Sequence, residues 1–226
     1  MKGDRAPLGK KIGRAYRVFF HSRVGHVMLL RRPARPELMT SYCDFAMGNE
    51  IHGFYHDREY GFPVSDERAL FERLLLEINQ AGLSWELILK KREGLRLAYD
   101  DFDVDRVAAY SDSDRSRLLG DSRVIRNRLK VNAAIFNARA VQALRESHGG
   151  FAGWLQAHHP LRKEEWVKLF RKTFRFTGGE ITGEFLMSIG YLPSAHREDC
   201  PVYAEIARLD PPWMQIDPSF WSRTAL

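Results

Sequence analysis

The stretch Glu77–Ile78–Asn79–Gln80–Ala81–Gly82–Leu83–Ser84–Trp85 joins two segments with helical periodicity. Gly82 is suited to end the first helix, because glycine adopts left-handed backbone conformations, and the serine after Leu83 is suited to cap the second. The stretch also carries a carboxylate at Glu77 and a large ring at Trp85. This combination favours insertion into a base stack, where an aliphatic group fills the gap and the ring and carboxylate receive the displaced base. The alternative is ordinary helix–loop–helix packing with both apolar side chains in the core.

Helical periodicity continues through the rest of the chain. From Ser65 to Ile78, apolar residues recur at intervals of three and four, which predicts a helix capped by Ser65. Further helices are expected over residues 84–99, 105–110, 113–119, 123–146, 151–157, 163–171 and 180–189. The expected apolar stripe of the long helix is Ile125, Leu129, Ala133, Phe136, Ala140 and Leu144. No alternating strand pattern and no internal repeat is evident, so the sequence predicts an all-α protein.

Length and composition narrow the class of protein. With 226 residues and 44% hydrophobic composition, the chain can bury a full core. The net charge of +6, mostly from arginine, suits a phosphate partner, although a soluble protein that is merely basic is the alternative. No apolar run approaches the roughly 18 residues of a spanning helix, and the N-terminus lacks a secretory pattern. Only two cysteines are present. We therefore expect a cytoplasmic, reducing setting and no membrane partner.

The two ends of the chain differ from its middle. Residues 1–40 are rich in lysine and arginine and almost free of acids, which indicates a basic arm for nucleic acid, a disordered extension, or a reading frame whose true start is Met39. Residues 201–226 contain several prolines and two tryptophans and predict an irregular strap over the surface. Between them, residues 41–200 are expected to form the functional domain.

Four potential metal ligands lie near the ends of that domain: Cys43, His56, His196 and Cys200. Their spacings are C-x12-H and H-x3-C, separated by a long gap. Two thiolates and two imidazoles complete a tetrahedral zinc site with no open position, which is a structural rather than a catalytic arrangement. The spacing matches no compact finger, so two buried free cysteines and two unrelated histidines remain the alternative.

Two further segments carry candidate binding residues. In the segment 55–63, Tyr55 and Tyr60 are either stacking surfaces or the edge of a core, and Tyr55 is expected to face Glu77 and Trp85 across a pocket. The segment 171–179 lies between two predicted helices. It either points free backbone N–H groups and basic side chains at a phosphate or forms a plain interhelical turn.

In this order, the segments resemble the DNA-3-methyladenine glycosylase I family, within the helix-hairpin-helix glycosylases. The most specific matches are Gln80-Ala-Gly-Leu-Ser-Trp85 and Tyr55-His-Asp-x-Glu59. Others include Leu70–Phe71–Glu72, Lys90–Lys91–Arg92–Glu93, Ile125–Arg126–Asn127 and Phe174–Arg175–Phe176 with Gly178, and the match covers roughly residues 43–200. The resemblance implies an all-α helix-hairpin-helix bundle and favours a structural zinc site, which joins the two ends of the domain.

The resemblance also implies a function and roles for individual residues. The enzyme is expected to flip 3-methyladenine out of double-stranded alkylated DNA and to hydrolyse its N-glycosidic bond, as a monomer and without strand cleavage. The implied catalytic residue is Glu77 and the implied wedge is Leu83. The base is expected to contact Tyr55, Tyr60, Trp85 and Phe45. The DNA backbone is expected to contact Lys172, Thr173, Phe174, Arg175 and Gly178, and zinc is expected to be held by Cys43, His56, His196 and Cys200.

Some positions depart from the family pattern. Tyr60 and Phe45 stand where the family usually has tryptophan, and Gly183 stands where an aromatic residue is usual. These positions concern the rim of the pocket and the hairpin region. Two alternatives therefore stay open: a glycosylase for another N3-alkylated purine, and a zinc-stabilised module that binds damaged DNA without cutting it.

Overall fold

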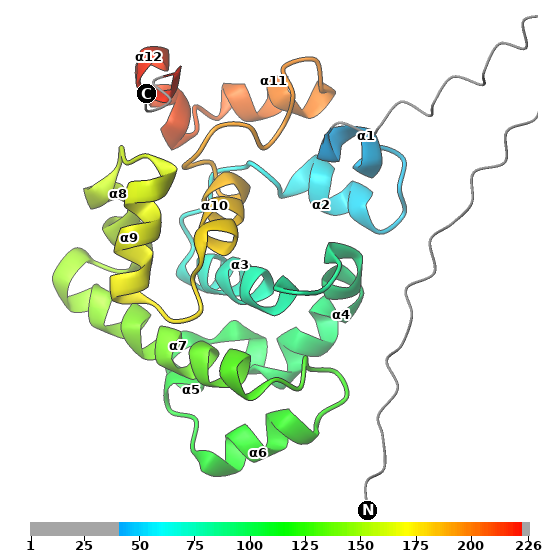
Figure 1. Ribbon diagram of the computed structural model, residues 1–226, viewed down its shortest axis with the longest axis vertical. Coiled ribbons are helices and arrows are strands. Elements are labelled where there is room, and N and C mark those ends of the chain that lie inside the picture. The colour runs from blue at the N-terminus through cyan, green and yellow to red at the C-terminus, as the bar shows by residue number, and fades with distance from the viewer. Residues whose placement is uncertain (1–40, 223–226) are drawn as a thin grey trace, which may run out of the picture. The chain divides into compact units, whose positions relative to one another are not determined.

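Helix α3 (Glu67–Gln80) is the central element of the fold, and helices α4, α7, α8 and α10 pack against it (Figure 1). The computed structural model describes residues 41–222. The other elements, in chain order, are α1 (Tyr42–Ala46), α2 (His52–Arg58), α4 (Trp85–Ala98), η1 (Asp100–Phe102), α5 (Val104–Ala108), α6 (Asp112–Gly120), α7 (Arg128–His148), α8 (Phe151–His158), α9 (Lys163–Thr173), α10 (Gly179–Ser188), α11 (Pro201–Arg208), η2 (Pro212–Gln215) and α12 (Pro218–Ser222). Over this range every regular element is a helix, which confirms the predicted class.

The two helices on either side of the Gly82 turn form as expected, with one change. Asp66, and not Ser65, caps α3, because its side chain accepts a hydrogen bond from the N–H of Ala69 at 2.8 Å. Gly82 has φ of +78°, a left-handed conformation that glycine adopts without strain. Ser84 caps α4 as predicted, and its hydroxyl accepts from the N–H of Leu87 at 3.3 Å. The helices on both sides of the turn are therefore each capped at their N-terminus.

The long helix α7 starts later than predicted, and its buried face differs from the predicted stripe. It begins at Arg128 instead of residue 123, because the Asn127 side chain accepts from the N–H groups of Leu129 and Lys130. Leu129 is 66% exposed and Phe136 is 41% exposed, so the stripe predicted through them was wrong. The residues of α7 that are buried instead are Lys130, Val131, Ala133, Ala134, Ile135, Asn137, Ala138, Val141 and Leu144. The shorter helices α5, α6, α8, α9 and α10 lie within two residues of their predicted bounds.

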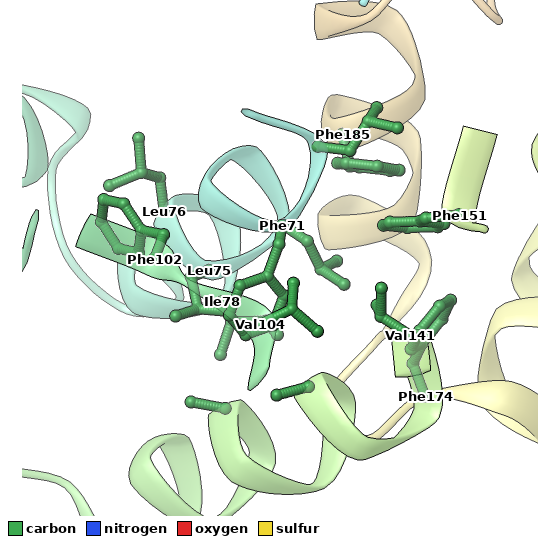
Figure 2. Packing of buried hydrophobic residues seen from close by; sticks show 14 of the residues in the cluster. Phe71, Leu75, Leu76, Ile78, Phe102, Val104, Val141, Phe151, Phe174 and Phe185 are labelled. Atoms are coloured by element: carbon green, nitrogen blue, oxygen red, sulfur yellow. The ribbon is translucent and has the colours of Figure 1, made fainter. Parts of the chain in front are cut away.

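The core continues from α3 into a cluster of aromatic rings between α8, α9 and α10 (Figure 2). Phe151 stacks on Phe185 with ring centroids 5.6 Å apart and contacts Phe174 at 5.1 Å. Phe174 is 1% exposed. Its side chain is therefore part of this core. Only the main chain of Phe174 can make the contact with the DNA backbone that was predicted for this residue.

The C-terminal segment is helical rather than irregular. Residues 201–222 form α11, η2 and α12, each with proline in its first turn, where proline is tolerated because its missing N–H has no partner there. The N–H of Trp213 donates to the carbonyl of Gly190 at 3.2 Å, and the Trp221 indole N–H donates to the carbonyl of Trp213 at 3.0 Å. The segment is thus attached to the domain. The expectations for residues 1–40 lie outside the described residues.

Candidate base-binding pocket and metal-ligand cluster

A cavity of about 700 Å³ lies beside the Gly82 turn. It is lined by Tyr42, Tyr55, Tyr60, Glu77, Gln80, Ala81, Gly82, Trp85, Gly178, Gly179, Glu180, Ile181 and Glu184. These residues come from α1, α2, α3, α4 and α10 and from the turns that adjoin them. The cavity therefore brings together five of the residues named from the sequence, which are Glu77, Tyr55, Tyr60, Trp85 and Gly178.

Aromatic rings form one side of the cavity. The ring centroid of Tyr55 lies 5.0 Å from that of Trp85 and 5.6 Å from that of Tyr60. Tyr42 lies 5.3 Å from Tyr60 and completes the group. Tyr55 and Tyr60 are buried, and Trp85 is half-buried. Such a wall offers π-faces to a flat, positively charged ligand.

An ion-pair network holds this wall in place. The Arg73 guanidinium lies 5.0 Å from the Tyr55 ring centroid and bonds Glu59 at 2.5 Å. Arg92 bonds the other oxygen of Glu59 and also Glu72, both at 2.7 Å. The network joins the end of α2 to α3 and α4. Because these groups are buried or half-buried, their geometry fixes the position of Tyr55 against α3.

Glu77 is the only one of the predicted base-contacting or catalytic residues with a carboxylate, and it is 5% exposed. It forms no hydrogen bond or ion pair within residues 41–222. Burial and, to a smaller extent, the nearby Glu184 carboxylate raise the pKa of Glu77, the positive charge of Arg73 opposes them, and the resulting pKa is about 8. At neutral pH the carboxyl group is therefore largely protonated in the empty cavity, and a cation placed beside it favours its ionisation.

Two lining residues were not anticipated from the sequence. Tyr42 precedes a predicted metal ligand, and Glu184 lies in α10, more than one hundred residues from Glu77 in the chain. The Tyr60 hydroxyl donates to Oε2 of Glu184 at 3.1 Å. Burial raises the pKa of Glu184, while the Tyr60 hydrogen bond and the charge of Lys163 oppose the shift. No local pattern marks either residue, because only the packing of α1 and α10 brings them to the cavity.

Phe45 does not take part in the cavity. Its ring packs against His52 at 4.7 Å and is 42% exposed, and it is absent from the lining. Leu83 is 36% exposed at the tip of the turn, outside the lining. The Lys130 ammonium supports that turn, since it donates to the carbonyls of Asn79 and Ala81 at 2.8 and 2.7 Å.

The turn between α9 and α10 borders the same cavity through Gly178. Lys172 and Arg175 are exposed, while the Thr173 hydroxyl is occupied by the carbonyl of Leu169 at 3.2 Å. The Asn137 side chain holds the main chain of Arg175 by accepting from its N–H at 2.7 Å and donating to its carbonyl at 3.1 Å. The turn is thus a fixed loop with two cationic side chains on its outer surface.

The four predicted metal ligands meet in space. The candidate ligand atoms of Cys43, His56, His196 and Cys200 all lie within 4.8 Å of one another, and all four residues are buried. Nδ1 of His196 lies 3.6 Å from each sulfur, and Nε2 of His56 lies 3.7 Å from the sulfur of Cys200. The group can hold a metal ion.

Comparison with known proteins gives this arrangement a family. Residues 45–169 match the model of the methyladenine glycosylase family, and a DNA-3-methyladenine glycosylase of Haemophilus influenzae is 34% identical over 182 residues, which are 72% of this chain and 98% of that protein. The chain belongs to the methyladenine glycosylase family. DNA-3-methyladenine glycosylase 1 of Escherichia coli is 32% identical, over 71% of this chain and 96% of that protein.

Solved structures of family members share the fold. A crystal structure of 3-methyladenine DNA glycosylase I matches with a TM-score of 0.64 and 33% identity, over 70% of this chain and 97% of that one. A structure of the Staphylococcus aureus enzyme, which concerns recognition of 3-methyladenine, matches with a TM-score of 0.65 and 28% identity, over 71% of this chain and 95% of that one.

Proposed function

We propose that this chain is a DNA-3-methyladenine glycosylase, which flips the damaged nucleotide into the cavity and hydrolyses its N-glycosidic bond to leave an abasic site. The observation that carries the proposal is Glu77, a buried carboxyl group without a cationic partner at ion-pair distance within residues 41–222, placed in a cavity walled by Tyr55 and Trp85. Family membership and the names of the relatives support the same activity.

The chemistry of the substrate fits these groups. Methylation at N3 gives the adenine of the nucleotide a positive charge, and the base leaves as a neutral molecule, so little acid catalysis is needed. The rings attract the cation through their quadrupoles. The Glu77 carboxylate accepts from the amino group of the base and, once ionised by the approaching charge, stabilises it. An ordinary adenine lacks this charge and is also harder to extrude from an intact pair.

The remaining steps are assigned to residues around the opening. Leu83, exposed at the tip of the turn, fills the gap in the base stack. The α9–turn–α10 unit is taken as the helix-hairpin-helix. In that unit, Lys172, Arg175 and the backbone at Gly178 hold the DNA backbone without reading sequence. No lysine lines the cavity within the described residues, which supports hydrolysis without a Schiff base and hence without strand cleavage.

The four-residue cluster is proposed to hold structural zinc. In a tetrahedral site with Zn–S near 2.3 Å and Zn–N near 2.0–2.1 Å, sulfur and nitrogen ligands are about 3.5 Å apart, close to the observed 3.6 and 3.7 Å. The other ring nitrogens are also held: Nδ1 of His56 bonds Asp57 at 2.6 Å and Nε2 of His196 bonds the carbonyl of Tyr60 at 2.7 Å. The metal stabilises the fold and takes no part in the reaction.

Because the proposed substrate is chromosomal DNA, we propose that the protein acts inside the cell. We also propose that it acts as a monomer. No helix within residues 41–222 is long and apolar enough to cross a membrane.

The test is base release from methylated duplex DNA, with the liberated purines separated by chromatography. Release of 3-methyladenine, with strand breaks only after treatment of abasic sites, is the expected result. Release of a different N3-alkylated purine would instead assign the changed rim at Tyr60 a role in specificity. Tight binding of damaged DNA without release of any base would overturn the proposal in favour of a binding module.

A further inference from the structure

The cavity contains a second carboxyl group that the proposed reaction leaves without a role. Glu184 lies on α10 and lines the same cavity as Glu77 on α3. Its Oε2 accepts from the Tyr60 hydroxyl at 3.1 Å, so the side chain is held on the cavity wall rather than free in solvent. Neither Glu77 nor Glu184 has a lysine, arginine or histidine at ion-pair distance within residues 41–222.

The titratable carboxyl groups that line the cavity have no cationic residue beside them in the lining, within the described part of the chain. Three such carboxyl groups line the cavity. Glu180, one turn before Glu184, is turned outward, since its side chain is 90% exposed and pairs with Lys163 at 3.5 Å. Arg73 is engaged by Glu59. The two carboxyl groups left facing the ligand are therefore Glu77 and Glu184.

We propose that Glu184 is a second base-binding carboxylate, and that it works with Glu77 to select positively charged purines over neutral ones. This inference rests on the proposed glycosylase activity and deepens it. Like charges at one site disfavour joint ionisation, so the empty pocket retains a proton. A cationic base removes this penalty because its charge lies between both groups, whereas a neutral base leaves the penalty in place. Glu184 thus increases the preference of the pocket for cationic bases over neutral ones. It does not increase the affinity for every base.

The pocket provides a way to hold Glu184 in position. Tyr60 donates to it through the hydroxyl, while the Tyr60 carbonyl accepts from His196 of the metal-ligand cluster. The other titratable or charged groups near the two carboxyl groups are Tyr42 from α1, Tyr55 from α2, Arg73 from α3, Lys163 from α9 and Glu180 from α10. Of these, only Arg73 and Lys163 are cationic, and both already have acidic partners.

The experiment compares the full-length protein with its Glu184→Gln variant, using duplex DNA that carries 3-methyladenine and measuring kcat/KM from pH 6 to pH 9. At pH 9 the variant is expected to be roughly tenfold slower, as for the loss of one charge interaction. At pH 6 the deficit is expected to shrink toward none, because removing the Glu184 charge lets Glu77 ionise at lower pH. The rising limb of the profile therefore shifts down by roughly one pH unit.

Two variants keep the result interpretable. Glu205→Gln removes an exposed carboxylate of α11 that pairs with Arg58 and lies outside the cavity lining, and we expect less than a twofold change with little shift of the limb. Tyr60→Phe removes the hydrogen bond to Glu184 and is expected to shift the limb in the same direction as Glu184→Gln. A Glu184→Gln deficit that is equal at every pH indicates a structural role and overturns the inference, as does an identical profile for both proteins. If the unmodified protein releases no 3-methyladenine, the proposed function itself fails.

Discussion

Glu77 is the residue proposed to serve the reaction, and its burial as an unpaired carboxyl group is expected to weaken the fold. We expect Glu77→Gln to slow release of 3-methyladenine by roughly 100-fold or more, because an amide keeps the hydrogen bond and loses the charge that complements the cation. Binding to DNA that contains an abasic analogue should change little, since the residues proposed to contact the DNA backbone lie in the turn between α9 and α10 and not at the carboxylate. Single-turnover base release and a gel-shift titration measure the two effects. Equal loss of both would mean that Glu77 is structural.

The same substitution has a pH signature in stability. The pKa of Glu77 rises on folding to about 8 from about 4.5, so the folded state binds an extra proton between these values. This group therefore lowers the free energy of unfolding as pH rises from about 4.5 to about 8, and above that range the cost is constant. We expect Glu77→Gln to melt close to the unmodified protein at pH 4.5 and above it at pH 9. A melting-temperature difference that does not grow with pH would contradict the raised pKa.

At this scale, sequence reasoning found the residues that stand in distinctive local runs. Tyr55, Glu77 and Trp85 fall in two such runs, and the structure brings them to one cavity. Phe45 was expected in the pocket but packs against His52 outside it. Glu184 was missed because a glutamate in an amphipathic helix is normally solvated, and only the tertiary position of α10 turns it inward.

At the scale of elements, the turn between α3 and α4 depends on a distant helix. The Lys130 ammonium of α7 donates to two carbonyls at the end of α3, where acceptors have no partner in their own helix. Lys130→Met keeps the buried stem and removes both hydrogen bonds. We expect a loss of about 1–3 kcal/mol in the free energy of unfolding and slower base release, because Leu83 is held less firmly. Chemical denaturation and base release measure these effects.

Lys90→Met is the matched control for that variant. Lys90 is an exposed lysine of α4, paired with Glu86 in the same helix, and surface pairs of this kind contribute at most about 1 kcal/mol. If Lys130→Met is no more destabilising than Lys90→Met, the support assigned to Lys130 is wrong.

Lys130 also explains why α7 was the least well predicted helix. The apolar stripe predicted from its sequence included Leu129 and Phe136 and left Lys130 outside the core. The structure does the reverse, since Lys130 is 4% exposed and finds its partners on α3. The start of α7 was also predicted incorrectly. Asn127 caps the helix, but the apolar residues before Asn127 continue the same periodicity, so the pattern extends the helix beyond its true start. By contrast, α3 and α4 have clear caps and a glycine between them, so their bounds follow from the sequence.

At the scale of the whole molecule, the metal-ligand cluster joins segments more than 150 residues apart, and the chain between them includes the cavity. We expect about one zinc per chain by elemental analysis, and a lower melting temperature for Cys200→Ser or after chelation, because binding free energy is available only to the folded state. His148→Gln, at a half-buried histidine outside the cluster, serves as the control. A stable, metal-free protein would exclude the zinc site.

Deletion of the C-terminal elements tests how far the pocket depends on the rest of the domain. A chain ending at Leu209 loses η2 and α12, and with them the buried Pro211 and the half-buried Trp213 and Trp221. Burial of large apolar side chains contributes about 1.5–3 kcal/mol each when complete, so we expect a clear fall in melting temperature from these partly buried groups. Every lining residue lies before position 185, and base release per folded molecule should therefore be retained below the new transition. Loss of release in a chain that is still folded would show that this segment shapes the pocket through Gly190 and the end of α10.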